Sequence, residues 1–372
     1  MFYQFLENEQ FNFQINRIVT YGEQNACLEE IKTIIPYLTD MESWTKNWLR
    51  LAEQAKSEGR FSQATYYYRM AEFYMVDDTP EKTTCYHNFK ECFEKANEDR
   101  LIQRFDIPFE GTFLPAIKMD AENPKGTILV HGGYDSFMEE FYPVVRNCTN
   151  FGYSLVMFEG PGQGQARKNG LIFRYDWEVP TSAVIDYFDL HDVNLMGISW
   201  GGYLAPRAAA FDLRIKNVIC YDIFYSGLDM LLNRLSKEDG NKLLLLLDKK
   251  QKLIVNQIIK EKMKRSIDLD WKIKHGMYIT GTTTPYDFLK SIEKHNLSPI
   301  TKKITQSILL LAGENDQYVP VERMNQLKKE LVHAQSVTSR IYTKAEGGDQ
   351  HCQVGNLPLV TEELYRFLDQ HN

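Results

Sequence analysis

The sequence predicts an α/β fold, with a mostly parallel sheet and helices on both of its faces. From about residue 99, short β-like runs alternate with helical stretches, which is the order of elements in a doubly wound sheet. Several of the runs are continuously apolar, as central strands buried on both faces are. The expected strands are 101–108, 112–119, 127–130, 153–158, 193–196, 218–221, 307–312 and 337–342.

Residues 1–98 are predicted to form an N-terminal helical domain that is part of a cap over the sheet domain. Trp44, Trp48 and Leu51 recur at spacings of three and four, so they share one helix face. Gly59 interrupts the pattern and a second helix follows, so that the pair resembles one tetratricopeptide unit. A chain of 372 residues is longer than one core usually fills, which agrees with a large domain plus a smaller one.

The larger domain, 99–372, is predicted to carry a helical insertion at about 226–300. More than eighty residues follow the strand that ends at Tyr221 before the next strand begins, and a structureless loop of that length is improbable in a compact domain. We expect the insertion to cover the sheet as a cap, with Trp271 and Tyr278 as substrate-binding residues. Formation of a homodimer is the alternative role for the insertion.

Charge and composition argue against several classes of partner. The net charge is −7, whereas a nucleic-acid-binding surface needs clustered Lys and Arg. The basic run 249–265 is interleaved with Leu and Ile, and we interpret it as the solvated face of a helix. The apolar run 243–247 is far shorter than the ~20 residues that span a membrane. Glu7 and Glu9, with no basic start, do not predict a signal peptide.

The six cysteines are scattered, with no C-x-x-C pair. This spacing predicts neither a zinc site nor a disulfide framework. The simplest expectation is a reduced, cytoplasmic protein that needs no metal and no organic cofactor.

A strand–turn–helix motif carries the strongest chemical signal. Gly197–Gly201 reads G-x-S-x-G around Ser199, and Gly202 follows. The apolar run 193–196 precedes this motif and a helical stretch, 203–210, follows it, which is the setting of a nucleophile elbow. The turn is tight and the backbone of the serine is strained, so neighbouring side chains must be small. We therefore expect Ser199 to be the nucleophile.

An activated serine needs a histidine base. His351 lies in a polar, Gly-containing loop after the last expected strand, where the base of such an enzyme should arrive. His333 lies in a helical pattern, and His371 is at the end of the chain. His295 closes the insertion, and His131 precedes the serine, so that we expect His131 to be structural. We predict His351 as the base.

The base needs a carboxylate that orients it. Asp316 lies in the loop after the strand 307–312, just before a helix expected to start near Val319. It precedes His351 by 35 residues, which is one helix–strand–loop unit (351 − 316 = 35). Asp222 also follows a strand and Glu314 shares the loop, so both remain alternatives to Asp316.

Two backbone N–H groups should stabilise the oxyanion. One should come from Trp200, the residue after the nucleophile. The other should come from the Gly-rich loop 131–135, which follows an expected strand. We predict the amide of Tyr134, with Gly133 as the alternative.

These motifs resemble a bacterial family with the α/β-hydrolase fold and an N-terminal helical domain. The family includes fermentation–respiration switch esterase-like proteins and dihydroxypseudooxynicotine hydrolase. The matching segments are 131–136, 159–164, 198–202, 312–316 and 350–353, with a weaker match at 271–281.

The resemblance implies esterase activity, and the predicted serine, histidine and aspartate imply that it proceeds through an acyl-enzyme. The many Tyr, Phe, Trp and Leu residues of the expected cap favour small apolar or aromatic acyl substrates. The resemblance also implies two alternatives: an acylaminoacyl or dipeptidyl peptidase-like amide hydrolase, and a hydrolase of a carbon–carbon bond next to a carbonyl, as in a β-diketone. The carbon–carbon hydrolase of the family uses an extra acid after the strand that follows the serine, near Asp222 and Asp229 here. A catalytically silent binding protein is the alternative outside the enzymes.

Overall fold

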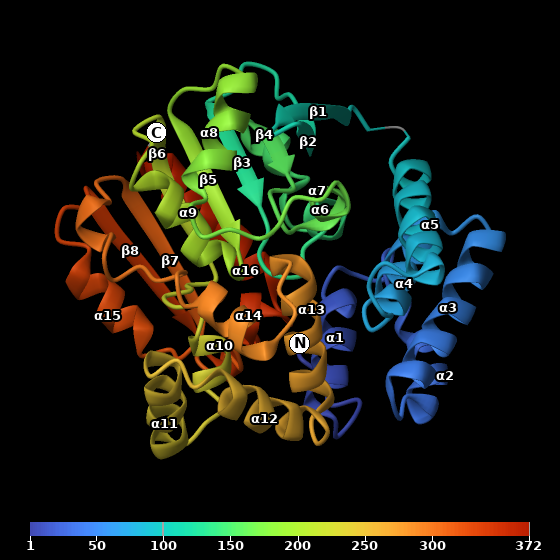
Figure 1. Ribbon diagram of the computed structural model, residues 1–372. Coiled ribbons are helices and arrows are strands. Elements are labelled where there is room, and N and C mark those ends of the chain that lie inside the picture. Colours follow the sequence, from blue (N-terminus) through green and yellow to red (C-terminus); the bar gives the residue numbers. More distant parts are fainter. Residues whose placement is uncertain (99, 372) are drawn as a thin grey trace.

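An eight-stranded sheet forms the centre of this computed structural model, which describes residues 1–98 and 100–371 (Figure 1). The strand order is β1-β2-β4-β3-β5-β6-β7-β8. The pairs β1–β2 and β2–β4 are antiparallel and all others are parallel, so the predicted mostly parallel sheet is confirmed. The strands are β1 (Gln103–Phe109), β2 (Thr112–Met119), β3 (Gly126–His131), β4 (Tyr153–Phe158), β5 (Val193–Ile198), β6 (Ile215–Tyr221), β7 (Ser307–Gly313) and β8 (Ser336–Tyr342).

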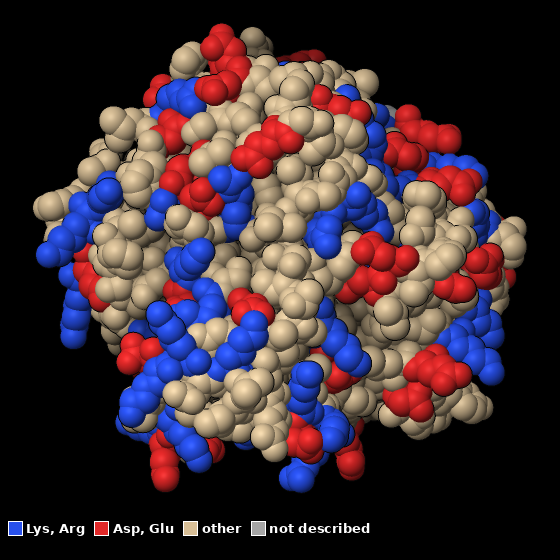
Figure 2. Space-filling model, in the orientation of Figure 1, with Lys and Arg blue, Asp and Glu red and all other residues tan. Residues whose placement is uncertain are grey.

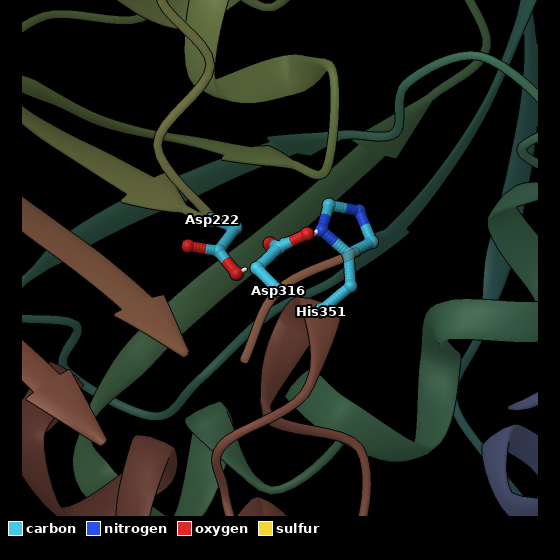
Figure 3. Close-up of side chains that lie close together, drawn as sticks. All are labelled: Asp222, Asp316 and His351. Atoms are coloured by element: carbon cyan, nitrogen blue, oxygen red, sulfur yellow. Dashed lines mark hydrogen bonds and ion pairs between the residues drawn. The ribbon is translucent and has the colours of Figure 1, made fainter. Parts of the chain in front are cut away.

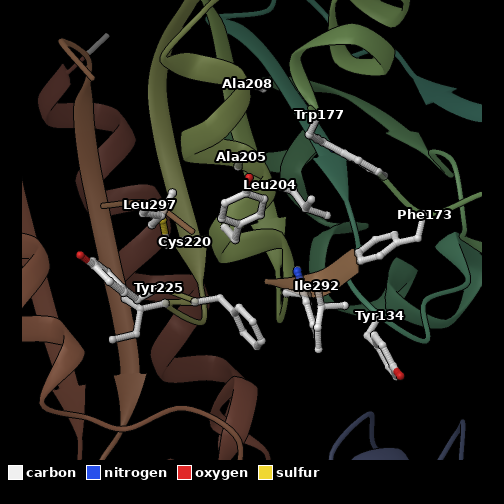
Figure 4. Packing of buried hydrophobic residues seen from close by; sticks show 14 of the residues in the cluster. Tyr134, Phe173, Trp177, Leu204, Ala205, Ala208, Cys220, Tyr225, Ile292 and Leu297 are labelled. Carbon is white, nitrogen blue, oxygen red and sulfur yellow. The ribbon is translucent and has the colours of Figure 1, made fainter. Parts of the chain in front are cut away.

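Helices cover both faces of this sheet because successive side chains of its strands point to opposite sides. Leu129 of β3 packs in the same cluster as Leu204 of α9, whereas Val130 packs with Phe141 and Leu364 on the other face. Figure 4 shows part of the first cluster. The first face is covered by α8 (Glu178–Tyr187), α9 (Gly201–Ala209) and α15 (Arg323–Glu330), and the second by α6 (Met138–Val145) and α16 (Leu357–His371).

Five helices precede β1, as expected for the N-terminal region. Trp44 and Trp48 of α3 are fully buried, and their rings pack in a cluster with Tyr67 of α4 and Phe11 of α1. The two helices of the expected pair, α3 and α4, lie side by side, and α5 packs on α4 (Figure 1). The five are α1 (Glu9–Val19), α2 (Leu28–Ile34), α3 (Met41–Ser57), α4 (Phe61–Glu72) and α5 (Pro80–Ala96).

The long connection between β6 and β7 is helical, as the sequence predicts. Thr284 caps the last of its helices by accepting a hydrogen bond from the amide of Asp287, and Pro285 occupies the first turn. The basic run 249–265 lies mainly on α12. The helices are α10 (Asp229–Leu232), α11 (Lys237–Asp248), α12 (Lys252–Met263), α13 (Ile267–Thr280) and α14 (Pro285–Ile292).

Two local expectations were wrong. The helix after Asp316 begins at Arg323 rather than near Val319, because the Asp316 carboxylate accepts hydrogen bonds from the amides of Tyr318 and Val319 in a turn. His333 is not helical, because α15 ends at Glu330 and a turn follows. A short helix, α7 (Gly164–Lys168), follows the Gly-rich segment after β4. Among the described residues, no helix is long and apolar enough to cross a membrane.

Candidate active site

Ser199 stands on a sharp turn between β5 and α9. Its φ of +62° lies in the left-handed region, where a residue with a side chain is strained. Its amide donates a hydrogen bond to the carbonyl of Tyr221 at the end of β6, 2.6 Å away. A Cβ on Gly197 would overlap the carbonyl of Gly201, and one on Gly202 would overlap the carbonyl of Asp222. The turn therefore requires the small residues that the motif supplies.

The structure brings Ser199, His351 and Asp316 together in one hydrogen-bonded chain. Ser199 Oγ lies 2.8 Å from His351 Nε2. His351 Nδ1 lies 2.6 Å from Asp316 Oδ2. The other carboxylate oxygen of Asp316 accepts hydrogen bonds from the amides of Tyr318 and Val319, at 2.7 and 3.0 Å. These two amides fix the carboxylate, which in turn fixes the imidazole plane.

The electrostatics of this chain favour an ionised carboxylate next to the imidazole. Burial by itself would raise the pKa of Asp316, but the neighbouring His351 lowers it below its usual value. Burial would likewise lower the pKa of His351, but the Asp316 carboxylate raises it well above 6.5. With the Nδ1 proton held by Asp316, Nε2 is free to accept the hydroxyl proton of Ser199.

Asp222 lies behind this pair as a second, fully buried carboxyl (Figure 3). Burial and the charge of Asp316 raise the pKa of Asp222 well above its usual value, so we assign the proton of the pair to Asp222, which donates it to Asp316. Asp222 Oδ2 also accepts hydrogen bonds from the amide of Cys352 and from Gln353 Nε2, at 3.1 and 3.2 Å. Its nearest approach to His351 Nδ1 is 3.8 Å, compared with 2.6 Å for Asp316.

Asp222, Asp316 and His351 could also offer ligand atoms to a metal ion, because one atom from each lies within 4.8 Å of the others. All three groups already bind one another and neighbouring protein groups. The arrangement is that of a carboxyl–carboxylate–imidazole relay.

The amides of Tyr134 and Trp200 remain the two candidates for the oxyanion. Within 1–98 and 100–371, neither amide donates a hydrogen bond to another protein group. The alternative, Gly133, is occupied because its amide donates to Ser136 Oγ at 2.6 Å. A Cβ on Gly133 would lie 2.6 Å from the amide nitrogen of Trp200, so only glycine lets this loop reach the elbow. The Tyr134 ring stacks on Trp200 at 5.2 Å.

A small cavity of about 70 Å³ lies against Ser199 and His351. Its walls are mostly aromatic and aliphatic, which suits an apolar group next to the reactive serine. Helix α1 supplies one wall through Phe13, Gln14 and Arg17. The sequence predicts a cap that includes the N-terminal helices, but it identifies no residue of α1 as part of the site.

Trp271 and Tyr278, the two residues expected to bind substrate, line different cavities. Trp271 lines the cavity at Ser199, stacks on Phe73 at 4.5 Å and donates a hydrogen bond from its indole to the Phe73 carbonyl. Tyr278 lies outside that cavity and lines a separate, smaller one. Its hydroxyl donates to Asp78 at 3.0 Å. Tyr278 is two helical turns beyond Trp271, which moves it about 10 Å along α13 and away from Ser199.

Buried ion pairs tie the Tyr134 loop to the N-terminal helices. Arg17 of α1 binds Asp135 Oδ2 at 2.7 Å and Glu140 Oε1 at 2.6 Å. Arg69 of α4 binds the other oxygen of Glu140 at 2.6 Å and the carbonyl of Asp135 at 2.6 Å. Burial would raise the pKa of Asp135, but these two guanidinium groups lower it to about 2. The Tyr134 loop is thus held by charges on α1 and α4.

The other histidines of the sequence analysis lie apart from Ser199. His131 is buried between Phe158 and Trp177, and burial lowers its pKa to about 4. His295 accepts a hydrogen bond from the indole of Trp200, on the side away from the serine. His333 contacts the carbonyl of Lys302, and His371 contacts Ser336.

Comparison with known proteins shows the family of the fold. The family model of the alpha/beta hydrolase fold matches residues 128–345, which is more than half of the chain. The chain is 29% identical to the hydrolyase poxO of Penicillium oxalicum, over 99% of both chains. It is 26% identical to the hydrolase LUC6 of a Fusarium species, over 97% of this chain and 96% of the relative.

A solved structure shares the whole fold. The 2,6-dihydroxy-pseudo-oxynicotine hydrolase superposes with a TM-score of 0.69 at 17% identity, over 95% of both chains. This likeness includes the N-terminal helices as well as the sheet, because it covers nearly the whole length. The protein is a hydrolase and belongs to the alpha/beta hydrolase family.

Proposed function

We propose that the protein is a serine hydrolase of the carboxylesterase type. The observation that carries this proposal is the chain of two hydrogen bonds from Ser199 Oγ to His351 Nε2 and from His351 Nδ1 to Asp316, at 2.8 and 2.6 Å. This is the constellation of nucleophile, base and orienting acid that serine hydrolases share across folds.

The proposed reaction starts as Ser199 Oγ bonds to the ester carbonyl carbon and His351 Nε2 takes the hydroxyl proton. The oxyanion accepts hydrogen bonds from the amides of Tyr134 and Trp200. The C–O bond to the alcohol then breaks, and His351 gives its proton to the leaving oxygen. Water, deprotonated by His351, attacks the acyl-enzyme, and the acid is released as Ser199 regains its proton.

Asp316 assists by stabilising the imidazolium that forms in each step. Its lowered pKa keeps it ionised, so that it can hold the proton on Nδ1. We further infer that the N-terminal helices and the insertion act as a cap, because α1 and Trp271 of α13 both line the cavity at Ser199. The apolar walls favour a small apolar or aromatic acyl group next to the serine.

A second candidate is hydrolysis of a carbon–carbon bond next to a carbonyl. The observation in its favour is Asp222, a buried carboxyl directly after β6 that hydrogen-bonds to Asp316 and whose pKa is raised well above its usual value by burial and by the charge of Asp316. In the family that the motifs resemble, the carbon–carbon hydrolase uses an additional acid after the strand that corresponds to β6. Cleavage of an amide is the third reaction that the same three residues support.

Labelling with a fluorophosphonate tests the proposal, because the reagent bonds covalently only to an activated serine. We expect the protein to be labelled and to hydrolyse p-nitrophenyl acetate, and Ser199→Ala to lose both. The matched control is Ser336→Ala, because Ser336 Oγ also lies 2.8 Å from a histidine, His371, but far from the cavity at Ser199.

Labelling that persists in Ser199→Ala, or a kcat above about a tenth of the parent value, would reject this nucleophile. A protein that is neither labelled nor active would be a binding protein on a hydrolase fold. A panel of p-nitrophenyl esters, aminoacyl anilides and β-diketones separates the three reactions, and we expect the esters to give the highest kcat/KM.

A further inference from the structure

A second, larger cavity lies next to the one at Ser199, and Ser199 does not line it. It has a volume of about 900 Å³, compared with about 70 Å³ for the cavity at the serine. The two cavities share Met230 and Lys272 as lining residues, so they lie on either side of these two side chains. The cavity at Ser199 has room only for the reactive carbonyl and its immediate neighbours. The rest of a larger substrate would therefore have to occupy the larger cavity.

The walls of the large cavity are amphipathic. Leucine and isoleucine side chains of α11 and α12, among them Leu243, Leu246 and Ile259, form the apolar part. Lys242, Lys262 and Arg265 stand on the solvent-exposed rim, together with Asp239 and with Glu9, which is paired with Arg234. Within the described part of the chain, none of these three cations forms an ion pair with a carboxylate.

The charge of this region contrasts with that of the whole chain. Residues 237–265 contain nine Lys and Arg against four Asp and Glu, a local charge of +5 (9 − 4 = 5) in a chain of net charge −7. Figure 2 shows Lys and Arg side chains gathered at the lower left, over α11 and α12 of Figure 1. A rim of this sign attracts anions to the mouth of an otherwise apolar cavity.

Two polar atoms of the same wall lack a protein partner. Asp268 Oδ1 and Gln317 Nε2 are both buried, and neither forms a hydrogen bond within the described residues. Buried polar atoms are ordinarily satisfied, so this wall offers one acceptor and one donor to a bound molecule. Lys272, between the cavities, is already paired with the other oxygen of Asp268 at 2.6 Å.

We infer that the large cavity binds the chain of an anionic amphiphile whose reactive carbonyl reaches Ser199. The apolar chain lies along α11 and α12, and an anionic group at its far end lies among Lys242, Lys262 and Arg265. The inference rests on the proposed ester hydrolysis, and it names the substrate class: long-chain esters with an anion remote from the cleaved bond.

The first experiment measures binding without hydrolysis. The monomethyl ester of dodecanedioic acid is titrated into Ser199→Ala by calorimetry, alone and combined with Leu246→Trp. We expect Leu246→Trp to weaken binding by more than about tenfold, because a ring in the cavity displaces at least two methylenes of the chain. Leu245→Trp is the matched control, because Leu245 is 51% exposed on the outside of the same helix. Equal affinity of Leu246→Trp and Leu245→Trp would overturn the inference, whatever the reaction at Ser199.

The second experiment tests the charged rim. We compare kcat/KM for the p-nitrophenyl monoester of dodecanedioic acid and for p-nitrophenyl dodecanoate. We expect the ratio to favour the anionic chain and to fall about two- to fivefold for each of Lys242→Gln and Lys262→Gln, and to fall with added salt. Lys249→Gln, a cation of the same region outside the cavity, should keep the ratio.

Failure of the proposed function is recognised separately. A protein that binds the monoester but hydrolyses neither p-nitrophenyl ester would keep this inference and reject the esterase proposal. A ratio that does not change in Lys242→Gln and Lys262→Gln would reject the anionic end. An anionic membrane surface is the other source of an anionic amphiphile, and sedimentation with phosphatidylglycerol vesicles tests for it. We expect the protein to stay in solution. Co-sedimentation that depends on Lys242 and Lys262 would assign these cations to a membrane surface instead.

Discussion

Replacing Asp316 and Asp222 one at a time with asparagine distinguishes the acid that orients His351 from the acid that supports it structurally. Asp316→Asn removes an ionised group 2.6 Å from His351 Nδ1 and puts an amide in its place. The amide can donate to Nδ1, so the proton moves to Nε2, which then cannot take the proton of Ser199. Loss of the correct tautomer costs about 10⁴-fold in kcat, or about 5.4 kcal/mol of transition-state stabilisation.

Asp222→Asn should affect stability more than activity. Burial and the charge of Asp316 raise the pKa of Asp222, and with the proton of the pair assigned to Asp222 the substitution changes no charge at the site. The Cys352 amide and Gln353 Nε2 both donate to Asp222 Oδ2, so an NH₂ group at that position leaves both donors without an acceptor, and each orphaned donor costs about 1–3 kcal/mol. We expect kcat to fall less than about tenfold and the free energy of unfolding to fall by about 2–6 kcal/mol.

The assay is kcat for p-nitrophenyl acetate together with urea unfolding of both variants. The reasoning is refuted if Asp222→Asn loses more activity than Asp316→Asn while remaining folded, because the orienting acid would then be the one after β6.

Three further predictions use the same ester and unfolding assays. The acid limb of the pH profile of kcat/KM should lie above pH 6.5, because His351 must be neutral to act as a base and Asp316 raises the pKa of His351. Asp316→Asn should move that limb to lower pH. An unmoved limb would contradict the assignment of Asp316 as the acid that orients His351. Trp271→Ala should change kcat/KM unevenly across short, long and aromatic acyl esters, by about 5- to 150-fold where the ring touches the acyl group, whereas Tyr278→Ala should leave the ratios unchanged. Arg69→Met should lower the free energy of unfolding by about 3–5 kcal/mol, because it leaves Glu140 and Glu72 buried with one counter-charge fewer; a loss below about 1 kcal/mol would mean that the pairs contribute little.

The strands and the reactive residues could be predicted because both leave local signals. A strand buried on both faces reads as a short apolar run, and β4 (Tyr153–Phe158) is buried at every position. Ser199 lies in a turn whose neighbours have to be glycine. Asp316 and His351 follow strands at the carboxyl edge of the sheet, where such groups gather in parallel sheets.

The choice between Asp316 and Asp222 could not be made with certainty from the sequence. Both follow a strand, β7 and β6, and these strands are neighbours in the sheet. Their carboxyl groups therefore meet, and only the distances to His351 Nδ1, 2.6 and 3.8 Å, separate them. The spacing of residues in the sequence does not predict which carboxyl lies closer to His351 Nδ1 when the two distances differ by only 1.2 Å (3.8 − 2.6 = 1.2).

The part played by α1 left no recognisable signal. Its buried face includes polar residues that hydrophobic periodicity reads as exposed, such as Asn12 and Asn16. Both are buried because they bind the backbone of the first residues: Asn16 Oδ1 accepts from the Tyr3 amide and Asn12 Oδ1 from the Phe5 amide. These hydrogen bonds explain why polar side chains of α1 are buried, and the ion pairs of Arg17 with Asp135 and Glu140 hold the helix against the sheet domain. No local pattern in the sequence encodes either kind of contact.

The N-terminal helices and the sheet domain both contribute residues to the proposed reaction centre. Tyr134, a proposed oxyanion donor, is followed directly by Asp135, and that residue is held by Arg17 and Arg69 from the N-terminal region. In the absence of α1 and α4, Asp135 and Glu140 would be carboxylates without their main counter-charges next to Ser199. Such charges favour solvent, so the loop would move outward and take the amide of Tyr134 with it. The position of the oxyanion donor is therefore set by ion pairs across the boundary between the two regions, and the cap is a structural requirement of the catalytic arrangement that we propose.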